Sequence, residues 1–266
     1  MDKQRLIIGE IPYANLFPIF FMLKRGPHLQ DYEFIQGPPS ELNKKLREGL
    51  IDVSPSSSIE YLRHREKYEL IENHSISSRG PVRSILLFTK KPIETLDGLT
   101  VLTSSQSETS VALVQIVLKK FYELDCHFES SGMPLGKALS SDYPYLLIGD
   151  EALRESVKWP GLHIYDLGDI WYKYTGLPFT FALWISHKAC CAGKSALYDE
   201  FIVDLDRAKT SALASLDTIA ASSPLKGTLS DEYLISYWKG MSYDFTREHK
   251  KGLELFRAYA KELGLA

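Results

Sequence analysis

The stretch Phe179-Thr180-Phe181-Ala182-Leu183-Trp184-Ile185-Ser186 is the part of the sequence that decides the fold. It follows the turn-forming residues Thr175-Gly176-Leu177-Pro178, and it is apolar over most of the length of one strand. A short apolar run that is bounded by turn residues and rich in aromatic side chains is typical of a buried strand. We predict that this strand carries the chain from a second domain back into a first one.

Short apolar segments alternate with segments of helical periodicity on the N-terminal side of this strand. Such an alternation predicts βαβ units and mainly parallel sheets. A second series of strands and helices begins after Lys90-Lys91-Pro92, which indicates a second, smaller domain. The expected strands are residues 6–11, 32–36, 51–53, 100–102, 126–130 and 145–148, and the expected helices are residues 16–24, 41–48, 58–64, 107–122 and a short one near Leu135.

On the C-terminal side of residues 179–186 the sequence is helical, with helices expected at residues 195–221, 231–239 and 248–263. We therefore expect a discontinuous first domain of residues 1–90 plus 185–266, with a helical C-terminal part, and an inserted second domain of residues 91–184. Two α/β domains joined by two crossing strands have the plan of the type II periplasmic-binding-protein-like fold. Such a fold holds its ligand in a cleft between the domains, at the carboxyl ends of strands and the N-termini of helices.

Composition and charge narrow the class of protein. The chain of 266 residues is 44% hydrophobic, which is enough to bury a core, and its 31 Lys and Arg against 34 Asp and Glu leave a net charge of -3. That balance gives no general attraction to nucleic acid or to an anionic membrane surface. The longest apolar run, residues 16–23, is shorter than the roughly 20 residues of a membrane span, and no signal peptide precedes the first strand. We expect a cytoplasmic protein with a small-molecule substrate and no nucleic-acid or membrane partner.

The familiar motifs of metal and cofactor chemistry are absent from the sequence. There is no GxSxG, HExxH, GxxxxGK[ST] or GxGxxG pattern. The seven histidines and three cysteines do not have the spacing of metal ligands. We therefore expect no metal ion and no cofactor, neither a nicotinamide nor ATP.

The residues that follow the expected strands are rich in hydroxyl and amide groups. Hydroxyls beside free backbone N–H groups at a helix N-terminus suit a carboxylate, because several donors and the positive end of the helix dipole converge there. A small dianion fits this pattern, and Arg83 or Arg79 would add a bidentate contact if either points inward. The candidate positions are Asn15 after the first strand, Ser56 and Ser57 after the third, Ser105, Ser107, Thr109 and Ser110 at the interdomain helix, and Gly149 and Asp150 after residues 145–148.

Each of these positions has a structural alternative. A Ser, Thr, Asn or Asp before a helix commonly serves as its N-cap, which contributes about 1 kcal/mol without any ligand. Asp150 stands before Glu151-Ala152-Leu153, where an N-cap is the simpler interpretation, and Asn15 precedes an apolar helix that it would cap. Arg83 would equally serve as a solvated charge at a sheet edge.

A family resemblance is carried by segments spread from residue 13 to residue 184. Taken in order, these segments closely resemble the chorismate dehydratases, the enzymes that remove water from chorismate in the futalosine route to menaquinone. They are Tyr13-Ala14-Asn15, residues 49–53 continuing to 58–61, residues 75–88, Ser107-Glu108-Thr109-Ser110, residues 147–153, residues 166–171 and residues 175–184.

The resemblance implies a type II binding-protein fold and a carbon–oxygen lyase that dehydrates chorismate to 3-[(1-carboxyvinyl)oxy]benzoate without a cofactor. It implies a catalytic role for Asn15. It also implies carboxylate-binding roles for Ser57, Ser84 and the group Ser107, Thr109 and Ser110. The general base stays open between a carboxylate of the substrate itself and an inward-turned residue such as Glu60 or Asp150.

Two alternatives remain open at this point, and so does the oligomeric state. The sister enzyme 1,4-dihydroxy-6-naphthoate synthase shares the fold, but its sequences have a Ser-Pro-Cys-Pro-Asn-Asp opening and a His-Asn-Thr-Tyr-Gly stretch. Here the opening is Ile11-Pro12-Tyr13-Ala14-Asn15, and no such histidine stretch occurs. The other alternative is a non-catalytic binding protein for a small organic anion.

Overall fold

The computed structural model describes residues 4–104 and 107–266, which form two compact units. Unit 1 comprises Met1–Ile76 and Ala182–Phe245, and unit 2 comprises Ser77–Phe181 and Thr246–Ala266. The chain passes between the units inside two strands, β4 (Tyr68–Ser78) and β10 (Phe179–His187). This division differs from the expected domains in three ways: unit 2 starts at residue 77 instead of 91, its inserted segment ends at residue 181 instead of 184, and it includes the C-terminal helix.

A six-stranded mixed sheet forms the centre of unit 1, in the order β11-β4-β10-β3-β1-β2. The strands β1 (Leu6–Glu10) and β2 (Tyr32–Gln36) pair in parallel, with Leu6 opposite Tyr32. The neighbouring β3 (Val53–Ser57) pairs antiparallel with β10, and the short β11 (Met241–Ser242) lies at one edge. The expected strands at residues 6–11 and 32–36 are confirmed to within a residue.

Strand β3 corrects the sequence interpretation of residues 51–58. The expected strand ended at Val53 and left the serines in a loop after it, but Ser54 to Ser57 are part of the strand and are buried. They pair with β10, with Ser57 opposite Ala182 and Pro55 opposite Trp184. Serine and proline have low strand propensity, so the sequence pattern did not indicate a strand at these residues. In the folded chain, pairing with β10 stabilises the strand.

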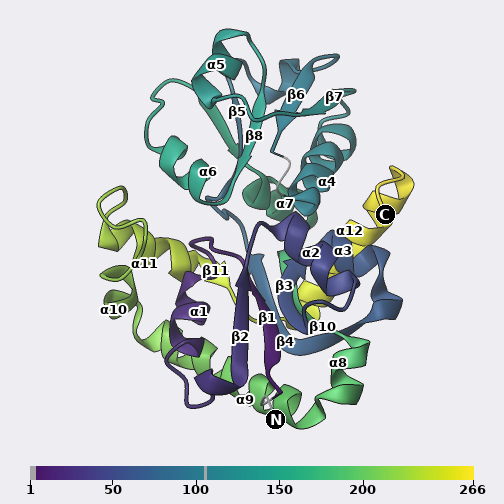
Figure 1. The fold of residues 1–266 in the computed structure, drawn as a ribbon. Coiled ribbons are helices and arrows are strands. Elements are labelled where there is room, and N and C mark those ends of the chain that lie inside the picture. The colour runs from purple at the N-terminus through teal and green to yellow at the C-terminus, as the bar shows by residue number, and fades with distance from the viewer. Residues whose placement is uncertain (1–3, 105–106) are drawn as a thin grey trace. The chain divides into compact units, whose positions relative to one another are not determined.

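Helices cover the sheet of unit 1 (Figure 1). Helix α1 (Phe17–Leu23) packs against the long α9 (Ser195–Ala214), and the Trp184 ring lies 5.6 Å from Phe20 and 5.8 Å from Phe201 between centroids. Because these rings come from both helices and from β10, they join helices and sheet in one core. The other helices are α2 (Pro39–Arg47), α3 (Ser58–Arg63), α8 (Lys188–Gly193), α10 (Leu216–Ala220) and α11 (Asp231–Gly240), with 3₁₀ turns at Leu29–Asp31 and Arg65–Lys67.

A five-stranded mixed sheet forms the centre of unit 2, in the order β7-β6-β8-β5-β9. Next to the edge strand β9 (His163–Asp166), strand β5 (Ile85–Thr89) pairs antiparallel with both β9 and the middle strand β8 (Tyr145–Ile148). These pairings explain why residues 77–90, which were expected in the first domain, belong to unit 2. The remaining strands β6 (Thr100–Thr103) and β7 (His127–Ser130) are parallel.

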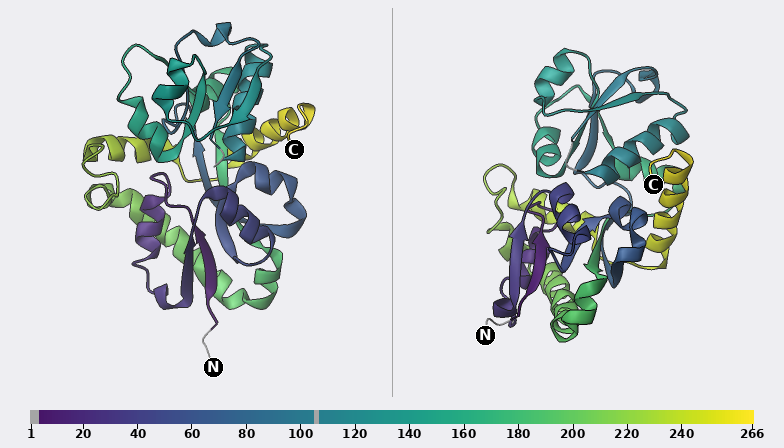
Figure 2. Two further views of the ribbon diagram at one scale, coloured as in Figure 1. Left: turned by 45° about the horizontal axis from the view of Figure 1, so that its top comes forward. Right: turned by 45° about the vertical axis from the view of Figure 1, so that its right-hand side comes forward.

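Helix α12 (Arg247–Glu262) belongs to unit 2, where it packs against α4 (Glu108–Ile116), as Figure 2 shows from two directions. An aromatic cluster fixes it there, with Phe256 at 5.0 Å from Phe179 and at 6.3 Å from Trp171 between ring centroids. Helix α4 continues directly into a π-helical turn, Val117–Phe121. A separate 3₁₀ turn spans Ile93–Thr95. The other helices of the unit are α5 (Leu135–Ser140), α6 (Gly149–Ser156) and α7 (Leu167–Thr175).

None of the helices in the described part of the chain combines the length and the apolar character needed to cross a bilayer.

Candidate functional site

Asn15 lies in the turn that joins β1 to α1 in unit 1. The helix has Leu16 at its N-cap position and receives no side-chain capping bond, so Asn15 does not cap it. The side-chain oxygen Oδ1 of Asn15 is buried, and no group in the described residues forms a hydrogen bond with it. A buried polar atom without a partner is costly and uncommon. The capping alternative for Asn15 is therefore wrong, and its Oδ1 has no donor among the described residues.

The serines of β3 form a second polar group in unit 1. Ser57 accepts a hydrogen bond from Nδ2 of the buried Asn43 at 3.0 Å, which leaves its own hydroxyl proton to be donated elsewhere. Oγ of Ser56 and Oδ1 of Asn43 are buried as well, and neither finds a partner within residues 4–104 and 107–266. Sequence reasoning missed Asn43, although an amide three positions before the buried Leu46 on the apolar face of α2 is a signal for it.

Ser84, Arg83 and Gly149 meet at the start of β5 in unit 2. The N–H of Gly149 donates to the carbonyl oxygen of the buried Ser84 at 2.7 Å, so two of the predicted site residues are adjacent. Arg83 has a left-handed backbone with a φ of 60°. A non-glycine residue in this region is held there against a steric cost, which is common at ligand sites. Its side chain is half-buried.

Asp166 holds this loop in place. Its carboxylate accepts hydrogen bonds from the N–H groups of Val82 at 3.0 Å and Arg83 at 2.5 Å, and it also caps α7 through Gly168 at 2.9 Å and Asp169 at 3.1 Å. Burial raises the pKa of the Asp166 carboxyl above its ordinary value, although the four N–H groups act in the opposite direction. Sequence reasoning did not single out Asp166, because the partners on the 82–83 loop are remote in sequence.

Replacing Asp166 by alanine is expected to destabilise the protein by about 3 kcal/mol, because four N–H groups lose a charged acceptor. Arg83 also loses the bond that holds its left-handed backbone. Urea unfolding measures the loss of stability. Asp97→Ala is the matched control in the same unit, since Asp97 accepts one exposed N–H bond, from Asp125. Equal stability losses in the two variants would contradict this role of Asp166.

The N-terminus of α4 carries the third polar group, also in unit 2. Ser107 is the N-cap, and its Oγ accepts from the N–H of Ser110 at 3.3 Å and lies 2.9 Å from the Ser110 hydroxyl. The capping alternative therefore holds for Ser107. Thr109 and Ser110 are buried in the first turn. Ser105 lies outside the described residues.

The two carboxylates considered as bases have different surroundings. Asp150 is in the first turn of α6 and is not its N-cap, because the helix begins at Gly149 and Ile148 is the cap residue. Glu60 is buried in unit 1, where it pairs with Arg47 Nη1 at 2.7 Å and accepts from the Tyr68 hydroxyl at 2.5 Å. Both of its oxygens are thus engaged. Glu60 therefore forms a structural ion pair with Arg47 in the core of unit 1 and is not a free base.

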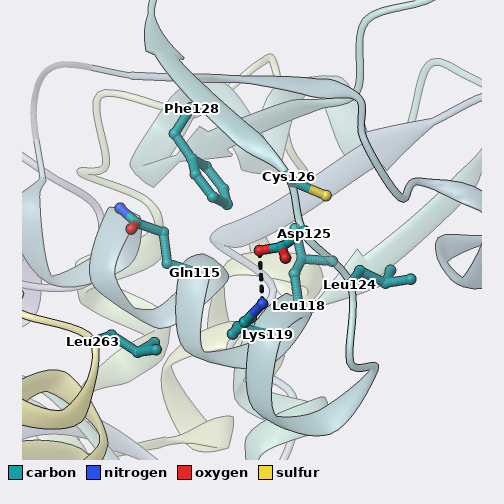
Figure 3. Close-up of a pocket in the computed structure, with 8 residues that line it drawn as sticks. All are labelled: Gln115, Leu118, Lys119, Leu124, Asp125, Cys126, Phe128 and Leu263. Atoms are coloured by element: carbon teal, nitrogen blue, oxygen red, sulfur yellow. Dashed lines mark hydrogen bonds and ion pairs between the residues drawn. The ribbon is translucent and has the colours of Figure 1, made fainter.

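A surface pocket of about 190 Å³ lies elsewhere in unit 2 (Figure 3). An ion pair between Lys119 and Asp125, at 2.7 Å, crosses it. It contains none of the predicted site residues, and it is smaller than the roughly 300 Å³ at which pockets for small molecules begin. Its lining residues are Gln115, Leu118, Lys119, Leu124, Asp125, Cys126, Phe128 and Leu263. We therefore do not regard this pocket as the candidate functional site.

A family model described as menaquinone biosynthesis matches residues 6–262. The chain belongs to this menaquinone biosynthesis family. Among its relatives, the chorismate dehydratase of Thermus thermophilus is 27% identical, over 97% of this chain and 95% of the relative. The chorismate dehydratase of Campylobacter jejuni is 31% identical, over 77% of this chain and 75% of the relative. The 1,4-dihydroxy-6-naphthoate synthase of T. thermophilus is a weaker match at 24%, over 99% and 96%.

Solved structures place this member of the menaquinone biosynthesis family in the expected fold class. A crystal structure of an Archaeoglobus fulgidus protein matches with a TM-score of 0.81 at 17% identity, over the full length of both chains. The periplasmic aliphatic sulphonate binding protein of Escherichia coli matches with a TM-score of 0.70 at 13% identity, over 99% of this chain and 88% of that one. The predicted periplasmic-binding-protein-like α/β fold is confirmed.

Proposed function

We propose that this chain is a chorismate dehydratase, a hydro-lyase that converts chorismate into 3-[(1-carboxyvinyl)oxy]benzoate for menaquinone biosynthesis through futalosine. The observation that carries the proposal is the buried side-chain oxygen of Asn15, for which the described residues supply no hydrogen-bond partner. It stands in a chain of the menaquinone biosynthesis family, two of whose relatives are named chorismate dehydratase.

The reaction removes one proton and one hydroxyl group from adjacent carbons of the chorismate ring. The C–H bond at the carbon that bears the enolpyruvyl ether breaks, and its electron pair forms the third double bond of the ring. The C–O bond to the neighbouring hydroxyl breaks, and the hydroxyl leaves with a proton as water. Because the product ring is aromatic, the enzyme has mainly to fix one conformer, orient the leaving group and exclude bulk water.

Asn15 is the proposed catalytic residue, and its amide orients the leaving hydroxyl or a carboxylate of the substrate. The burial of its Oδ1 atom favours this role, because a preorganised dipole acts more strongly where water is excluded. Ser57 is a proposed carboxylate donor in unit 1, since its oxygen already accepts from Asn43 and its proton is free to point at a ligand. The other proposed binding residues are Ser56 in unit 1 and Arg83, Ser84, Ser105, Ser107, Thr109, Ser110, Gly149 and Asp150 in unit 2.

We propose that a carboxylate of the substrate itself takes the ring proton, with Asp150 as the second candidate. Glu60 is withdrawn as a base because Arg47 and Tyr68 engage both of its oxygens. Asp150→Asn distinguishes the two candidates. It leaves turnover within a few-fold if the substrate supplies the base, and it lowers turnover by about 10² or more if Asp150 does.

The deciding experiment is to incubate the purified protein with chorismate, without added metal or cofactor, and to follow the product by mass spectrometry. We expect a product lighter than chorismate by one water, with the ultraviolet spectrum of a substituted benzoate. A rise in melting temperature with chorismate but no product would favour the anion-binding alternative. If chorismate has neither effect, the cyclic substrate of the naphthoate synthase becomes the compound to test.

A further inference from the structure

The backbone on either side of the Asn15 peptide is held by two buried aromatic side chains of unit 1. Nε1 of Trp238 donates to the carbonyl oxygen of Ala14 at 2.7 Å, and the hydroxyl of Tyr243 donates to the carbonyl oxygen of Asn15 at 2.9 Å. Trp238 is fully buried and Tyr243 is 4% exposed. Two successive carbonyl groups of one turn are thus fixed by donors that water does not reach.

Both donors come from the far end of the chain, 224 and 228 positions after the residues that they contact. Trp238 is in α11, and its ring is stacked near Phe17, the first residue of α1, at 6.4 Å between centroids and an interplanar angle of 24°. Tyr243 follows β11, and its own carbonyl oxygen accepts from the N–H of Ser75 in β4 at 3.0 Å. Each donor is therefore itself anchored, one to helix α1 and the other to the sheet.

The Tyr243 hydroxyl is a permanent donor. Burial raises its pKa well above the ordinary value for tyrosine, and the neighbouring Tyr237 acts in the same direction. The phenol thus stays protonated at every pH at which a folded enzyme is assayed.

We propose that Trp238 and Tyr243 are positioning residues for the dehydration, which act by fixing the peptide that carries Asn15. This inference rests on the proposed function of Asn15. A side-chain amide has two rotatable bonds, so its placement is set by the backbone atoms behind it. A shift of about 1 Å in a reacting group lowers turnover by as much as 10²-fold. The C-terminal segment of unit 1, residues 231–245, therefore serves catalysis in addition to packing.

Tyr243→Phe tests the inference, because it removes one oxygen and keeps the ring. We expect kcat to fall about tenfold with KM changed less than about twofold, since the substrate still binds and only the orientation of Asn15 is lost. Tyr32→Phe is the matched control. The Tyr32 hydroxyl also makes one buried hydrogen bond in unit 1, to Asp204 at 2.8 Å, so its loss affects stability without affecting kcat. Trp238→Phe is the second variant, and we expect it to repeat the kcat effect.

A double-mutant cycle separates positioning from general loosening of the fold. In an Asn15→Ala background, where no amide is left to position, Tyr243→Phe is expected to change the residual kcat less than twofold. If the two substitutions instead lower kcat by independent, multiplying factors, the proposal is wrong. A kcat of Tyr243→Phe equal to that of the wild type overturns it as well.

Hydrogen exchange of the peptide that covers residues 11–19 gives a readout that does not depend on activity. Tyr243→Phe is expected to speed exchange there by about tenfold, and Tyr32→Phe is not. Unchanged exchange in Tyr243→Phe overturns the inference even in an active enzyme. If the wild-type protein does not dehydrate chorismate, the proposed function fails, and the exchange data alone then decide whether Tyr243 fixes this turn.

Discussion

Asn15→Ala is expected to lower kcat for chorismate dehydration by about 10² to 10³, which is the effect of removing one preorganised polar group from a buried site. The same change should leave the free energy of unfolding unchanged or slightly raised. Within the described residues Oδ1 of Asn15 is buried without a partner, so its removal relieves an unsatisfied polar atom. Loss of turnover without loss of stability distinguishes a catalytic group from a structural one.

The measurement is steady-state turnover by mass spectrometry, together with urea unfolding of the same preparation. Asn73→Gly is the matched control, because it removes another amide of unit 1 at a residue whose φ of 64° glycine adopts without strain. We expect the control to keep wild-type turnover. If Asn15→Ala also kept it, Asn15 would be a passive part of the turn. A loss of several kcal/mol of stability would instead show that the amide serves the fold.

Gly252→Ala is expected to destabilise the protein by about 3 kcal/mol, a strong steric effect for the addition of one methyl group. Gly252 is inside helix α12, where alanine would normally stabilise a helix by about 1 kcal/mol. Here a Cβ atom would overlap the carbonyl oxygen of Pro178, a backbone atom that no rotamer change can move away. The expected change in the free energy of unfolding is therefore opposite in sign to the change that helix propensity alone predicts.

Urea or thermal unfolding monitored by circular dichroism measures this effect. Gly193→Ala is the control, since Gly193 is likewise a helical glycine, at the last residue of α8, and has open space where its Cβ would be. We expect no loss of stability in the control. Equal behaviour of the two variants would mean that α12 does not pack against Pro178 as closely as the structure has it.

Local pattern was sufficient for elements whose side chains repeat with a clear period or form a continuous apolar run. Residues 32–36 and 145–148 are strands with the predicted bounds, and helix α12 begins and ends within a residue of its prediction. Helix α12 buries one face, and residues 145–148 are an apolar run that is buried throughout, so in both cases the sequence carries the information directly. The return strand of residues 179–186 is confirmed for the same reason.

Local pattern failed where pairing between distant segments outweighs the propensity of the residues. The serines and the proline of β3 are part of a strand because β10 pairs with them, and residues 77–90 belong to unit 2 because β5 pairs with β8 and β9. Neither partner is close in sequence. A prediction from periodicity has no access to such pairings.

The sequence by itself determined the α/β class, the return strand and the position of Asn15 between the first strand and the first helix. Only the tertiary structure decided which polar side chains are already engaged. Glu60 forms an ion pair with Arg47 and accepts a hydrogen bond from Tyr68. The buried Oδ1 of Asn15 has no hydrogen-bond partner among the described residues. The tertiary structure also supplies Tyr243, 228 positions away, to hold the Asn15 peptide. The physical reason is that hydrogen-bond satisfaction depends on which groups meet in space, whereas sequence periodicity records only which face of an element is buried.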